Sequence, residues 1–119
     1  MMGVENPTVI DFVGHNSRTD QVTLAIVEER VWDGSEERLM QLQAKINNYL
    51  SFVLDGQFAQ MYPDFRDKPL VFQLDCSFAP DASSYSFLDQ VKNALTNYKI
   101  GWVVKVFGAN DQTRRRGGP

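Results

Sequence analysis

The chain has one cysteine, Cys76, and one histidine, His15, among its 119 residues. A single cysteine excludes an intrachain disulfide and any zinc site built from several thiolates. A single histidine argues against histidine-rich metal clusters and against catalysis that needs several imidazoles. The sequence therefore predicts no cofactor and no metal site.

Long apolar runs and an excess of basic charge are also missing. Uninterrupted apolar stretches fall far short of the ~20 residues that a membrane-spanning helix needs. The first residues contain neither a basic region nor an apolar segment, so we expect no secretory signal. With a lone cysteine, this favours a cytoplasmic protein with no membrane contact. The formal net charge of −3 disfavours a dedicated nucleic-acid-binding domain, which is usually strongly basic.

Catalytic signatures are absent as well. The glycines are scattered rather than grouped in a phosphate-binding loop, and no Gly-x-Ser-x-Gly motif is present. His15 lies in a turn-rich stretch, whereas Cys76 alternates onto the apolar side of its strand, so a Cys–His pair is disfavoured. These absences favour a protein without enzymatic activity.

What the sequence does contain is an ordinary globular composition, 43% hydrophobic, of a length that suits one domain. We predict a single α/β domain over residues 1–108 and a disordered basic tail over residues 109–119. The tail carries Arg114, Arg115 and Arg116 against Asp111, so it contributes +2 to the net charge of −3 and the body carries −5. Such a tail can touch phosphates weakly, which leaves weak nucleic-acid contact as an alternative function.

The hydrophobic periodicity changes several times along the chain. Apolar residues with period two predict strands over residues 9–13, 21–32, 70–78 and 100–107, the first two forming a hairpin. Spacings of three and four predict a helix over residues 35–55, with Asp33 as its cap and Gly56 just past its end, and a second helix after Ser84. The element order ββαβαβ predicts an α+β fold, a two-layer α/β sandwich. Its four-stranded mixed sheet would carry both helices on one face, with the strand order beyond the hairpin left open.

Several short motifs resemble a known family. They are Val9-Ile10-Asp11-Phe12, Trp32-Asp33, the stretch from Gln43 through Lys45-Ile46-Asn47 to Tyr49-Leu50, and Tyr62-Pro63. Together they resemble an uncharacterised small bacterial domain-of-unknown-function family over roughly residues 9–107. The resemblance implies a bacterial cytosolic domain and carries no activity.

Amide and aromatic residues form the first candidate site. Gln43 and Asn47 lie four residues apart at the margin of the apolar face of the long helix. Together with Trp32 and Tyr62 they could rim a pocket for a small ligand. The alternatives are that the amides bond to loop backbone near Tyr62 and that Trp32 plugs the core.

The second candidate is a protein-binding surface on the same helix. Phe52 is predicted to point away from the apolar face, beside Lys45, and Tyr49 at the edge of that face would extend the patch. Either the segment after the helix covers Phe52 or a partner does. We therefore predict a non-catalytic protein-interaction module, with a protein partner or a homodimer, and retain a ligand-binding protein or enzyme as the alternative.

Overall fold

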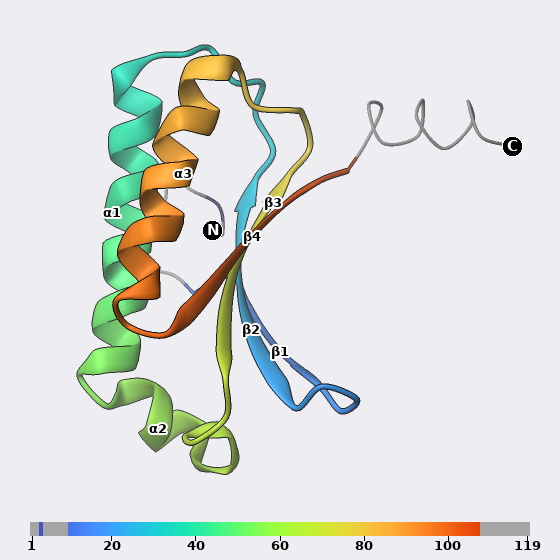
Figure 1. Ribbon diagram of the computed structural model, residues 1–119, viewed down its shortest axis with the longest axis vertical. Helices are drawn as coiled ribbons and strands as arrows, with labels where there is room; N and C mark the ends of the chain where they lie inside the picture. Colours follow the sequence, from blue (N-terminus) through green and yellow to red (C-terminus); the bar gives the residue numbers. More distant parts are fainter. Residues whose placement is uncertain (1–2, 4–9, 108–119) are drawn as a thin grey trace, which may run out of the picture.

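The computed structural model describes Gly3 and residues 10–107, which form one two-layer unit (Figure 1). The elements are β1 (Phe12–Asn16), β2 (Gln21–Glu28), α1 (Glu36–Leu54), α2 (Gln57–Met61), the 3-10 helix η1 (Pro63–Phe65), β3 (Leu70–Cys76), α3 (Ala82–Thr96) and β4 (Ile100–Val106). The predicted tail, residues 109–119, lies outside the described residues.

The strands form one mixed sheet in the order β1-β2-β3-β4. β1 is antiparallel to β2, whereas β3 is parallel to both β2 and β4. α1 connects β2 to β3 and α3 connects β3 to β4, and both helices lie on the same face of the sheet (Figure 1). The predicted element order, mixed sheet and two-layer sandwich are confirmed, and the strand order that the sequence left open is sequential.

The core lies between the sheet and the two helices. Alternate strand residues point into it, which is why the apolar positions of β2, β3 and β4 recur with period two. Its fully buried side chains include Val22, Leu24, Ile26, Phe72 and Leu74 from the strands. Leu42, Ile46, Leu88 and Leu95 come from the helices that cover them.

α1 begins at a serine cap. The Ser35 hydroxyl oxygen accepts the backbone N–H of Arg38 at 3.3 Å. Asp33, the predicted cap, instead accepts the backbone N–H of Ser35 at 2.9 Å, so the prediction was wrong by two residues. The hydrogen bonds from Ser35, helped by the charge of Arg38, lower the pKa of Asp33 below its ordinary value. A carboxylate just outside a helix N-terminus is also favoured by the helix dipole.

The segment after α1 folds back against the domain, which is one of the two alternatives left open for the cover of Phe52, through two short helices that the sequence pattern did not indicate. Gly56 has φ 91°, in the left-handed region where glycine is favoured, and it turns the chain from α1 into α2. Phe58 then packs edge-on to Phe52, with ring centroids 6.0 Å apart. The ring centroid of Tyr62 lies 5.5 Å from that of Phe58 and 6.0 Å from that of Phe65.

No helix in residues 10–107 combines the length and the hydropathy that crossing a membrane requires.

Candidate functional site

The sheet has a second face, opposite the helices, over which no described element lies (Figure 1). We call this surface the open face. Its side chains lie in rows across the strands because paired residues point to the same side. One row is Phe12, Ala25, Gln73 and Val103, a second is Gly14, Thr23, Val71 and Gly101, and a third is Val27, Asp75 and Lys105.

Apolar side chains are exposed on this face at both edges of the sheet. Phe12 on β1 is 58% exposed, Val103 on β4 is 38% exposed, and Phe107, one residue past β4, is 47% exposed. Phe107 continues the ladder because its N–H donates to the Cys76 carbonyl oxygen at 2.7 Å. Two of the three residues therefore lie on the β4 side of the sheet, one on the strand and one directly after it.

A shallow hollow lies beside Phe12. Gly14 forms part of its floor, and a Cβ there would come within 2.7 Å of the Phe12 ring, so the ring lies across the glycine. The hollow measures about 380 Å³ and includes Thr23 and Gln73 in its lining. The absence of a side chain at Gly14 thus leaves this corner of the open face concave.

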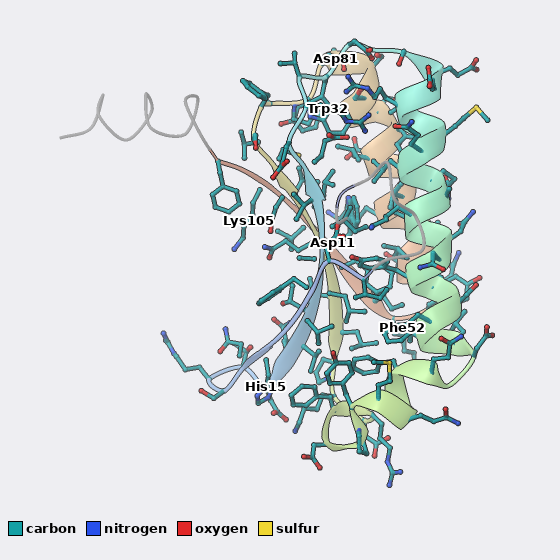
Figure 2. The ribbon with its side chains drawn as sticks, turned by 180° about the vertical axis from the view of Figure 1, so that it is seen from behind. Asp11, His15, Trp32, Phe52, Asp81 and Lys105 are labelled. Carbon is teal, nitrogen blue, oxygen red and sulfur yellow. The ribbon has the colours of Figure 1, made fainter. Side chains whose placement is uncertain are left out.

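The three rows of the open face contain one acidic and one basic side chain, next to the last residues of β3 and β4. Asp75 and Lys105 are paired positions on β3 and β4, and Figure 2 shows Lys105 on the side of the sheet away from the helices. The Gln73 side-chain amide donates to Asp75 at 2.8 Å, which holds that carboxylate in place. The face is therefore nearly neutral, although the body of the protein is acidic.

The four residues of the predicted ligand pocket lie in separate places. Gln43 and Asn47 hydrogen-bond to each other, at 3.0 Å, rather than to loop backbone. They line a groove of about 360 Å³ between α1 and α3, opposite Gln90 and Tyr98. Its floor is apolar and includes Ile46, Leu50, Val91 and Leu95.

Trp32 and Tyr62 do not line this groove. Trp32 is buried, and its indole N–H donates to the Phe78 carbonyl oxygen at 3.1 Å, so it plugs the core near the carboxyl end of the sheet. Tyr62 contacts the rings of Phe58 and Phe65 in the segment after α1, near the opposite end of the sheet. Figure 2 shows Trp32 near one end of the molecule, with α2 and η1 at the other.

The predicted interface residues are buried within the chain. Phe52 is 8% exposed, and Tyr49 and Lys45 are not exposed at all, so of the two alternatives for Phe52 the one in which the following segment covers it holds. The buried face of α1 is wider than the face marked by its apolar residues, because it also includes Lys45. α2 covers Phe52 through Phe58, and Lys45 turns inward to meet a buried carboxylate.

That carboxylate belongs to Asp11, which lies between the sheet and α1 (Figure 2). The Lys45 ammonium donates to Asp11 at 3.0 Å, with both side chains fully buried. The backbone N–H groups of Gly3 and Val27 also donate to the Asp11 carboxylate, each at 3.0 Å. The charges are thus compensated by hydrogen bonds, as buried charges must be.

Tyr49 completes this buried cluster. Its hydroxyl oxygen accepts the backbone N–H of Asp11 at 2.9 Å, and its proton is donated to the Ala25 carbonyl oxygen. Burial raises the pKa of Tyr49 well above its ordinary value. Because none of these groups reaches solvent, the cluster joins α1 to the sheet instead of forming a reactive site.

The cysteine and the histidine lie far apart. His15 pairs with Val22 at the start of β2, whereas Cys76 lies at the end of β3, a separation of six strand residues or roughly 20 Å. Burial, and next the negative charge of Glu28, raise the pKa of the Cys76 thiol to about 12. His15 bonds to Asp20 at 2.9 Å and stacks on Phe65. Among the described residues, no three His, Cys, Asp or Glu side chains are grouped to hold a metal ion.

A signal for the exposed residues on β4 was present in the sequence. Ile100, Trp102, Val104 and Val106 mark the inward side of this strand, so Val103 and Phe107 are apolar residues on the side expected to be wet. Sequence reasoning did not single them out because isolated apolar residues on a wet face are common.

Comparison with known proteins gives one match. No curated protein and no solved structure matches the chain. A family model described as a family of unknown function, DUF6572, matches residues 2–108, almost the whole chain. This confirms the resemblance to a domain-of-unknown-function family, and the chain belongs to that family of unknown function.

Proposed function

We propose that this domain is a non-catalytic protein-interaction module that associates with a second copy of itself. The observation that carries the proposal is the pair of exposed apolar residues, Val103 and Phe107, at the β4 side of a sheet face that no described helix covers. Burying exposed apolar surface is the main favourable term in protein association. The buried Phe52, Tyr49 and Lys45, expected at the interface from sequence, have no part in this proposal.

The charge of the open face favours a second copy over an unrelated partner. In a two-fold dimer the same patch must be complementary to itself. A face on which one acidic residue, Asp75, balances one basic residue, Lys105, meets this condition because neither sign of charge dominates it. A strongly charged face would repel its own copy.

The chemistry of the side chains supports a role without catalysis. The thiol of Cys76 is buried, which raises its pKa, and His15 lies at the other end of the sheet. The cytoplasmic location that forms part of this proposal is supported by the use of a single, buried cysteine, since secreted domains of this size are often stabilised by disulfides.

Sedimentation equilibrium of the purified protein tests the proposal. We expect dimers at about 100 µM, and at least tenfold weaker association for Val103→Asp, which places a charge in the apolar patch. Met40→Asp is the matched control, because Met40 is an exposed apolar residue on α1, 66% accessible and away from the open face. A wild-type monomer at this concentration, or equal association of the two variants, would overturn the proposal.

A second candidate function rests on the groove between α1 and α3. Its apolar floor and its rim of Gln43, Asn47, Gln90 and Tyr98 contain no charged side chain, which suits an uncharged ligand with one apolar and one amide-like end. Benzamide has this chemistry and can serve as the probe. Saturable shifts of the Gln43 and Asn47 side-chain amide signals in a nuclear magnetic resonance titration would support this function, and unchanged signals would remove it.

A further inference from the structure

The two edges of the sheet differ in length and in protection. β1 has five residues and contains Gly14. β4 has seven residues, of which five are apolar or aromatic, one is Gly101 and only one, Lys105, is charged. Natural edge strands are usually shortened, bulged, or protected by proline or several charges. β4 has no proline and pairs with β3 in an unbroken register over its whole length. It is therefore an edge suited to pairing with another strand.

The hydrogen-bond pattern shows which backbone groups of β4 point outward. In a parallel pair, alternate residues direct both their N–H and C=O groups to the same neighbour. Since the N–H of Phe107 donates to Cys76 of β3, Lys105, Val103 and Gly101 also address β3. The N–H and C=O groups of Ile100, Trp102, Val104 and Val106 point to the outer edge, where no described strand lies.

We infer that two copies of this chain pair through β4, antiparallel to each other, about a two-fold axis at Val103. This inference rests on the self-association proposed above and names its interface. The two four-stranded sheets would then form one continuous sheet. All seven residues of β4 would be paired, and every outward backbone group would find a partner.

This register is consistent with the side chains as well. Val103 meets the partner's Val103 on the open face, which buries part of the exposed apolar surface. Lys105 lies opposite the partner's Gly101, so no like charges are opposed. Trp102 lies opposite the partner's Val104 on the helix side, an aromatic and β-branched pair of the kind that stabilises sheets.

Shifted registers are less favourable. Moving the axis to Trp102 places Lys105 opposite the partner's Lys99, which lies in the turn before β4 with φ 59°, so Lys105 would have no strand residue to pair with. Moving it to Val104 leaves the outward groups of Ile100 beyond the end of the partner's strand. Only the axis at Val103 pairs the complete strand.

Disulfide cross-linking of Val103→Cys tests this geometry. At a non-hydrogen-bonded antiparallel pair the Cα atoms are about 4.5 Å apart, within the range that a disulfide spans. Under mild oxidation at a dimer-forming concentration, we expect most of the Val103→Cys protein to become a covalent dimer on a non-reducing gel. The native Cys76 gives no background because it is fully buried.

Val71→Cys is the matched control, because Val71 lies on the open face in the interior strand β3. We expect no cross-link there. A cross-link at Val71 but not at Val103 would mean that the open faces stack on each other and would overturn edge pairing.

A proline variant gives a second, independent measurement. Val104→Pro removes one outward N–H without removing a β3–β4 hydrogen bond, and edge strands tolerate proline in this orientation. We expect at least tenfold weaker dimerisation of a protein whose circular dichroism is unchanged. Where this variant fails to fold, the cross-link alone decides.

The outcomes separate this inference from the proposed function. A wild-type monomer contradicts both. A wild-type dimer that Val103→Cys does not cross-link leaves self-association standing and overturns the β4 interface. Pairing of β4 with a strand of another protein, and not with a second copy of this chain, would also overturn the inference.

Discussion

At the scale of single residues, the ammonium group of Lys45 is buried between α1 and the sheet, where it pairs with Asp11. A lysine on an otherwise polar stretch of helix is normally solvated, since a charged group loses several kcal/mol of hydration when it is buried. Here the carboxylate of Asp11 compensates that loss, and the backbone N–H groups of Gly3 and Val27 satisfy the remaining carboxylate lone pairs. The pair links α1 to the start of β1.

Lys45→Met tests the contribution of this pair. Methionine retains most of the apolar volume but leaves the Asp11 carboxylate buried without its cation, so we expect a loss of ~3–5 kcal/mol in the free energy of unfolding. Urea denaturation followed by circular dichroism measures the loss.

Two further variants sharpen this measurement. Lys92→Met, at an exposed position of α3, should change the free energy of unfolding by no more than about 0.5 kcal/mol. The double variant Asp11→Asn/Lys45→Met should be more stable than Lys45→Met alone, because it removes the uncompensated charge. A loss below about 1 kcal/mol in Lys45→Met would contradict the account of the buried pair.

At the scale of elements, the short helices α2 and η1 decide which side of α1 is exposed. Five rings follow one another from the core to the β1–β2 turn: Phe52, Phe58, Tyr62, Phe65 and His15. Each neighbouring pair has its centroids 5.0–6.0 Å apart, within the range of favourable aromatic contacts. The segment thus acts as a cover for Phe52 and as a support for the hairpin.

Phe58→Ala should remove this cover. Phe58 is 2% exposed and contacts rings on both sides, so truncation leaves a cavity, and we expect a loss of ~3–5 kcal/mol in stability. Hydrogen exchange should also become faster over residues 57–65, while the β2–β3 ladder stays protected.

Met61→Ala serves as the control within the same helix. Met61 is 63% exposed, so its truncation should leave both stability and exchange nearly unchanged. Equal effects of the two variants would mean that α2 does not act through Phe58.

At the scale of the whole molecule, charge separates the proposed self-association from nucleic-acid binding. The body carries −5 and the tail +2, so two copies repel each other weakly, whereas the three arginines of the tail attract phosphate. The proposed β4 interface consists of backbone hydrogen bonds and apolar contacts, with no ion pair between copies. Added salt should therefore leave self-association unchanged or strengthen it, whereas it should weaken nucleic-acid binding.

Raising sodium chloride from about 0.05 M to 0.5 M should therefore leave dimerisation unchanged or strengthen it up to a few fold, because screening reduces the repulsion. Sedimentation equilibrium at both salt concentrations measures this. Dimerisation that weakens tenfold would contradict an apolar interface. Binding of a single-stranded oligonucleotide that disappears at high salt and on deletion of residues 109–119 would instead support the nucleic-acid alternative.

Most of the fold could be predicted from local sequence patterns. Periods of two and of three to four placed β2, β3, β4 and both long helices, and the core side of Cys76 followed from the same alternation. The first strand was predicted over residues 9–13, but β1 begins at Phe12 and contains His15, which the sequence had assigned to a turn. α2 and η1 were missed because each is too short to show a period. The cap of α1 was assigned to Asp33 instead of Ser35 because both residues accept backbone N–H groups near a helix start.

The sequence by itself determined the class of fold, because periodicity and chain length are local properties that any sandwich of this order must satisfy. Only the tertiary structure decided which residues remain exposed. Lys45 meets Asp11 across 34 positions of the chain, and α2 returns to cover Phe52. Which face of the sheet stays open depends on where the two crossover helices pack. Exposure is set by such long-range contacts, and for that reason the candidate interface moved from α1 to the edge of β4.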